Sequence, residues 1–139
     1  MGPDSNPIKP IAVPGVPDIL TRSLVRSVCL GPEGLDVIVE NSVEGSTLGL
    51  KVHFGCTYGV RVLDEGDLND FWDANWSDAG GGAIFEIKSG GWLDQEKARP
   101  GFIGAYSDWA REFFITGIDD CVNVIAAEPP IIEVIELTK

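Results

Sequence analysis

The chain has 139 residues, of which 44% are hydrophobic and 23% are charged, so it is long enough to form one domain with a buried core. Its formal net charge is −12 at pH 7, and its isoelectric point is about 4.2. This charge argues against nucleic acids and anionic membranes as partners, because both would be repelled, and favours a basic protein partner.

Residues 1–18 are rich in proline, and we predict an extended N-terminal arm with little sheet, because proline cannot donate a backbone hydrogen bond. Residues 19–139 are predicted to form a single β-rich domain. The N-terminal stretch lacks the apolar run of a secretory signal, and no segment reaches the roughly 20 apolar residues of a membrane helix. We therefore expect a cytoplasmic protein.

Apolar and polar residues alternate along much of the chain, with the period of two that is typical of strands with one buried face. Short connections with turn-forming residues separate these segments. The pattern predicts a mostly-β fold, an antiparallel sheet or sandwich of seven to eight short strands with one short helix; an α+β arrangement is the alternative. The predicted strands are residues 23–30, 34–41, 47–55, 58–64, 83–92, 111–117, 121–127 and 131–137.

The segment "VRVLDEGDLNDFWDANWSD" at residues 60–78 breaks the alternation and is strongly acidic. The spacing of Leu68, Phe71 and Trp72 predicts the short helix at about residues 68–74. A carboxylate-rich face with an aromatic residue suits a partner rich in lysine and arginine. The predicted partner-binding residues are Asp64, Glu65, Asp67, Asp70, Asp73, Trp76 and Asp78.

A metal site and a catalytic site are two alternative interpretations of the same acids. A calcium-binding loop starting at Asp73 fails, because Asp78 stands where glycine is needed and Ile84 stands where a carboxylate is needed. A carboxylate hydrolase needs two acids that face one cleft and have pKa values pushed apart. Clustered acids more often form a solvated face, so the sequence predicts neither a metal nor a cofactor.

The sulfur and imidazole groups do not form a recognisable catalytic set either. The chain has three cysteines and one histidine. Cys56 and Cys121 are predicted to lie in the core, with all thiols reduced, and His53 on a polar strand face. His53 and Cys56 would point to opposite faces of one strand, which argues against a Cys–His dyad. No nucleophile elbow or phosphate loop accompanies them, so we predict that the protein is not an enzyme.

Trp76 is one of four tryptophans and lies between Asp73 and Asp78 in a polar segment. A tryptophan framed by carboxylates is suited to anchor a basic partner. The alternative is that Trp76 covers an edge of the core.

The stretches "VRVLDEGDLNDFW", "SGGWLDQE" and "REFFITGIDDCVNVIAAEPPIIEV" together resemble small bacterial proteins of toxin–immunity neighbourhoods. The resemblance covers about residues 58–135 and is one of style, without a motif that assigns single residues. Immunity proteins of contact-dependent and polymorphic toxin systems are typically small, acidic, cytosolic and non-catalytic. The resemblance implies an acidic binding protein that neutralises a cationic toxin by blocking its active site. The alternatives are a structural or assembly protein whose charge confers solubility, or a small enzyme with a carboxylate site.

Overall fold

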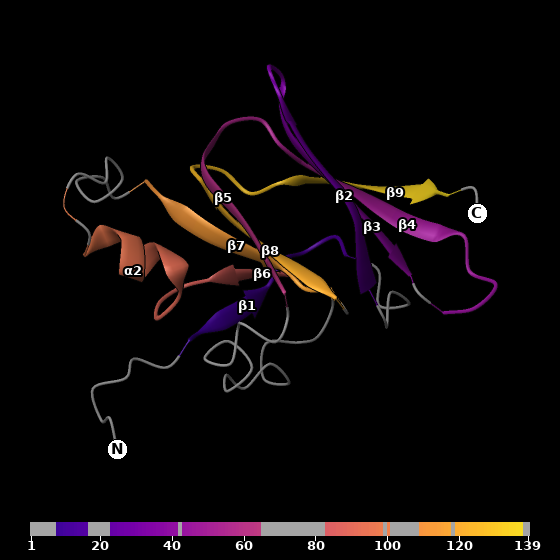
Figure 1. Ribbon diagram of the computed structural model, residues 1–139, viewed down its shortest axis with the longest axis horizontal. Helices are drawn as coiled ribbons and strands as arrows, with labels where there is room; N and C mark the ends of the chain where they lie inside the picture. Colours follow the sequence, from indigo (N-terminus) through magenta and orange to yellow (C-terminus); the bar gives the residue numbers. More distant parts are fainter. Residues whose placement is uncertain are drawn as a thin grey trace.

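The computed structural model describes residues 8–16, 23–41, 43–64, 83–98, 100, 109–117 and 119–137. In this part of the chain the strands form one five-stranded and one four-stranded sheet, shown in Figure 1. Every pair of neighbouring strands is antiparallel. The prediction of a mostly-β, antiparallel fold is confirmed.

The order of the strands in each sheet departs from their order in the sequence. The five-stranded sheet runs β1 (Pro10–Ala12), β6 (Ile84–Ile87), β7 (Arg111–Ile115), β8 (Asp120–Ala126) and β5 (Thr57–Asp64). The four-stranded sheet runs β2 (Ser23–Gly31), β3 (Gly34–Asn41), β4 (Leu48–Phe54) and β9 (Ile131–Glu136). The chain therefore passes between the sheets after β1, after β4 and after β8.

The main core lies between the two sheets, as in a β-sandwich. Val37 on β3 and Val52 on β4 are cross-strand partners and are fully buried. They belong to the same apolar cluster as Val122 on β8, so the inward faces of both sheets share one core. The rings of Phe54 and Phe113 lie 5.5 Å apart in this cluster. The alternation predicted from the sequence is observed on β3, where every second residue is buried, whereas β7 and β8 are buried on both faces.

The other face of the five-stranded sheet carries smaller apolar clusters and a short helix. Phe85 and Phe114 pack there with Cys121. Helix α2 (Trp92–Lys97) lies beside β7 (Figure 1). Its Leu93 belongs to one apolar cluster with Ile125 of β8. This helix covers the sheet at the place where a charged side chain, described below, is buried.

The predicted strand at residues 83–92 is wrong beyond β6, because the chain turns after Ile87 and enters helix α2 at Trp92. The sequence does carry signals for this helix, since Asp94 lies in its first turn and Lys97 in its last. The predicted helix at residues 68–74 lies outside the described residues. In the predicted N-terminal arm, residues Pro10–Ala12 pair with β6 at the sheet edge, where proline is tolerated.

Candidate functional site

Of the predicted partner-binding residues, only Asp64 lies within the described part of the chain. Glu65, Asp67, Asp70, Asp73, Trp76 and Asp78 lie outside it. Asp64 ends β5 and is the cross-strand partner of Asp120, the first residue of β8. Both side chains are exposed, and exposed Asp119 precedes Asp120. The fold thus places carboxylates from two distant segments at one end of the five-stranded sheet.

Like charges directly opposite each other on neighbouring strands repel and destabilise the pairing. The Asp64–Asp120 pair has this arrangement, and the acidic segment that begins at Asp64 continues from it. We refer to Asp64, Asp119 and Asp120 as the acidic sheet end.

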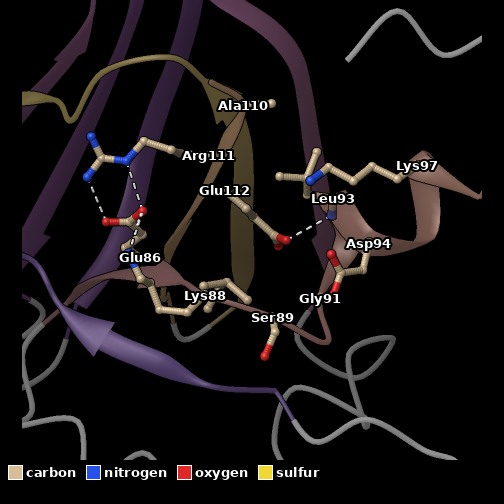
Figure 2. A pocket seen from close by; sticks show the side chains of 11 residues that line it. Glu86, Lys88, Ser89, Gly91, Leu93, Asp94, Lys97, Ala110, Arg111 and Glu112 are labelled. Carbon is tan, nitrogen blue, oxygen red and sulfur yellow. Dashed lines mark hydrogen bonds and ion pairs between the residues drawn. The ribbon is translucent and has the colours of Figure 1, made fainter. Parts of the chain in front are cut away.

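A second candidate centre surrounds Glu112 on β7, which is 1% exposed. Its Oε1 accepts a hydrogen bond of 2.8 Å from the backbone N–H of Leu93, in the first turn of helix α2 (Figure 2). Its Oε2 accepts a hydrogen bond of 2.8 Å from Nδ2 of Asn123, which is also fully buried. Gly91, at the start of the helix, has no side chain with which to cap it. The carboxylate of Glu112 therefore caps the helix from a neighbouring strand.

Arg61 on β5 contacts both Asn123, which holds the buried carboxylate, and Trp92 of the helix. Its Nε donates a hydrogen bond of 3.3 Å to Oδ1 of Asn123. Its guanidinium also lies 5.0 Å from the ring centroid of Trp92, within the range of a cation–π contact. The chain Arg61–Asn123–Glu112 thus joins β5, β8 and β7 to the start of α2.

Burial raises the pKa of the Glu112 carboxyl above its ordinary value. Hydrogen bonds from the backbone of Leu93, from Asn123 and from the backbone of Trp92, together with the charge of Arg61, act in the opposite direction. Because the pKa is raised, the loss of hydration on burial destabilises the charged carboxylate more than these contacts stabilise it.

Glu86 on β6 has the opposite environment. Arg111 donates to it through two nitrogens, with distances of 2.9 Å from Nε to Oε2 and 2.8 Å from the terminal nitrogen to Oε1. These hydrogen bonds lower the pKa of Glu86, and the charges of Arg111 and Lys88 lower it further, although burial opposes them. Arg111 also lies 5.4 Å from the ring centroid of Phe113.

Glu86 and Glu112 both line a cavity of about 220 Å³, so they resemble the two acids of a carboxylate enzyme. The register separates them: Glu86 is opposite Phe113, and Ile87 is opposite Glu112. Partners across a sheet share a face and successive residues alternate, so the two acids lie on opposite faces. In Figure 2 their carboxylates point apart, one to Arg111 and the other to α2. They do not converge on one substrate position.

Another cavity, of about 380 Å³, lies where the chain passes between the sheets. His53 and Cys56 both line it, which corrects the expectation that they face opposite sides of one strand. The reason is that β4 ends at Phe54, so Cys56 belongs to a turn. His53 lies on the outer face, as predicted, and its Nδ1 is 2.7 Å from Oδ1 of its cross-strand partner Asp36.

Cys56 was predicted to lie in the core, but it is exposed, because the turn that carries it leaves the sheet. Cys121 is buried as predicted, and all three thiols are free. The side chain of Cys56 forms a hydrogen bond with Tyr58, and this contact raises the pKa of the tyrosine above its ordinary value. Within the described residues, no group of histidine, cysteine and acidic side chains is arranged to hold a metal ion.

The buried Glu112–Asn123 contact was missed from the sequence. The available signal was that Glu112 and Asn123 each interrupt an otherwise apolar run, in "REFFI" and "CVNVIA". No family model, curated protein or solved structure matches this chain. None of the described helices is long and apolar enough to span a membrane.

Proposed function

We propose that this chain is a non-catalytic acidic protein that binds a basic protein partner, and that it acts as an immunity protein by blocking a cationic toxin. The observation that carries the proposal is the acidic sheet end, where Asp64 and Asp120 face each other on neighbouring strands. Facing carboxylates concentrate negative charge at this end of the sheet, and such charge attracts a basic partner. The net charge of −12 supports the same partner chemistry.

Two further observations favour binding over carboxylate catalysis. Glu112 is engaged as the cap of helix α2, and Glu86 is held by Arg111 on the opposite face of the sheet. Each of these perturbed carboxyl groups therefore has a structural partner, and the two carboxylates point apart although both residues line one cavity. An acidic binding surface needs no such convergence, because it acts by steering and occlusion.

The test uses the protein encoded by the gene next to the gene for this chain. Association and dissociation rates are measured by surface plasmon resonance at low and high salt. Because exposed charges are screened, we expect the association rate to fall steeply with ionic strength while the dissociation rate changes less. Toxicity of the partner in cells, with and without this chain, tests the immunity role directly.

The matched variants are Asp64→Asn/Asp120→Asn and Glu33→Gln/Glu133→Gln. Both pairs remove the same charge. In the second pair, Glu33 lies in the turn between β2 and β3 and Glu133 lies on β9, and both are exposed. We expect the first pair to slow association more than the second. Equal rates for both pairs would assign the effect to net charge alone, and absence of binding to any basic neighbour would leave the acidic surface as a solubility feature.

A further inference from the structure

The second cavity lies at the junction of the two sheets. Its walls come from two of the connections between the sheets, at Cys56 after β4 and at Glu128 after β8. Tyr58 on β5 and Ile131 on β9 also line it. Its volume of about 380 Å³ falls within the range of about 300–1,000 Å³ for ligand pockets.

Large apolar side chains are unusually exposed around this cavity. Ile131 is 71% exposed and Tyr58 is 48% exposed. The ring of Tyr58 lies 4.3 Å from that of Trp109, which is 39% exposed and precedes β7. Single exposed apolar residues are normal, but here Tyr58 and Ile131 line one cavity and Tyr58 also packs against exposed Trp109, so the exposed apolar surface is concentrated in one place. Tryptophan and tyrosine are the residues most often enriched at energetic centres of interfaces.

The charge of the cavity selects the kind of side chain that fits. Glu128 is exposed and lines it, and Asp36 contacts its His53. Neither lysine nor arginine is among the described residues that line it. Aromatic faces attract cations, and arginine stacks on such rings while its guanidinium bonds to carboxylates. A cavity with aromatic, apolar and acidic walls is therefore complementary to arginine.

We propose that this cavity receives an arginine side chain of the basic partner. The guanidinium stacks on Tyr58 and faces Glu128, and the aliphatic stem lies against Ile131. This inference rests on the proposed function for the identity of the partner, but its site is separate from the acidic sheet end. Tyr58 is near the start of β5 and Asp64 ends it, so the two sites are about 20 Å apart at ~3.3 Å per residue. One interface of standard size spans that distance.

The first experiment needs no natural partner. Acetyl-arginine amide is titrated into the protein, and NMR signals of the Tyr58 ring, the Ile131 methyl groups and the Trp109 indole are followed. Acetyl-citrulline amide, which has nearly the same shape without the charge, is the control ligand. We expect saturable shifts with the arginine probe and at least about fivefold weaker binding of the citrulline probe. Equal binding of both probes, or shifts confined to other parts of the protein, would overturn the proposal.

Variants identify the groups responsible. Tyr58→Ala and Glu128→Gln should each weaken binding of the arginine probe several-fold, whereas Tyr58→Phe keeps the ring and should retain it. Val43→Ala and Glu44→Gln, which change an exposed valine and an exposed acid in the β3–β4 connection, should leave the affinity unchanged. Thermal unfolding of each variant shows that the fold is intact. Unchanged affinity in Tyr58→Ala with an intact fold contradicts the proposed site.

The natural partner separates this inference from the proposed function. If both are correct, Tyr58→Ala raises the dissociation rate of the partner about tenfold, and Asp64→Asn/Asp120→Asn lowers its association rate. If the partner binds with salt dependence but Tyr58→Ala and Glu128→Gln have no effect, the binding function holds and the arginine site is wrong. If no basic partner binds while the arginine probe does, the site holds and the proposed function fails.

Discussion

Glu112 on β7 caps helix α2 through the backbone N–H of Leu93, at 2.8 Å from its Oε1. The same carboxylate accepts from Asn123, so one buried side chain fixes both a helix terminus and a neighbouring strand. Because both contacts are made by residues distant in the sequence, α2 depends on the assembled sheet for its position.

Replacing Glu112 by alanine should lower the free energy of unfolding by about 1–3 kcal/mol, because a buried donor on Asn123 and the N–H of Leu93 lose their acceptor. Urea denaturation followed by circular dichroism measures the change. Glu136→Ala is the control, since Glu136 is exposed at the end of β9 and its loss should change stability by about 0.5 kcal/mol or less. Equal stability of the two variants contradicts the capping role.

The raised pKa of Glu112 predicts a specific pH dependence. Its contribution to stability is fully present below the ordinary pKa of 4.5 and is lost as the pH rises through the higher pKa of the folded state. The stability of the parent protein relative to Glu112→Gln should therefore decrease as the pH rises from about 4 to neutral. Unfolding free energies measured in urea at several pH values test the sign. A difference that increases with pH would exclude burial as the dominant influence.

Glu86 should show the opposite trend. Its pKa is lowered by Arg111, so its contribution is present above the ordinary value of 4.5 and is lost as the pH falls through the lower pKa of the folded state. The stability of the parent protein relative to Glu86→Gln should decrease on acidification. Added salt should reduce the effect, because the pair is partly exposed and therefore screened.

Gly91 should not tolerate a larger residue. A β-carbon at this position would lie 2.6 Å from Oε1 of Glu112 and 2.8 Å from Cγ2 of Ile87. Gly91→Ala should therefore destabilise the protein by about 1–3 kcal/mol, as expected for overpacking. Gly31→Ala is the matched control, since its β-carbon would meet nothing within 4 Å. Similar unfolding midpoints for the two variants would show that α2 can shift without cost.

The thiols should fall into two classes. Cys29 and Cys56 are exposed, whereas Cys121 is buried and its Sγ lies 3.6 Å from the carbonyl oxygen of Gly117. Ellman's reagent should modify Cys29 and Cys56 quickly and Cys121 only after denaturation. Peptide mapping by mass spectrometry identifies the sites, and rapid modification of Cys121 in the native protein would contradict its burial.

The acidic segment beyond Asp64 is tested with the partner. Replacing Asp70, Asp73 and Asp78 together by asparagine should slow association, as high salt does. Trp76→Ala should instead speed dissociation, with a cost of about 2 kcal/mol if Trp76 is an anchor. If both variants bind as the parent protein does, this segment is a solvated face and the interface lies elsewhere.

The strands were largely predictable because their signal is local. Alternation at residues 34–41 follows from the geometry of one strand and is observed on β3, where Leu35, Val37 and Val39 are buried. The same reasoning failed at residues 88–92, which were assigned to a strand but form a turn and the first residue of helix α2. A helix of this length has little intrinsic stability, and it is held by a carboxylate from another element.

The sequence alone determined the fold class, the net charge and the chemistry of the acidic segment, because composition and period-two patterning depend on neighbouring residues. Only the tertiary structure decided that β5 pairs with β8, which brings Asp64 opposite Asp120, and that Glu112 reaches the start of α2. It also decided that Tyr58 contacts Trp109 and that Tyr58 and Glu128 line the same cavity. These relationships join residues far apart in the chain, and their positions follow from strand order and register, which local patterns do not encode.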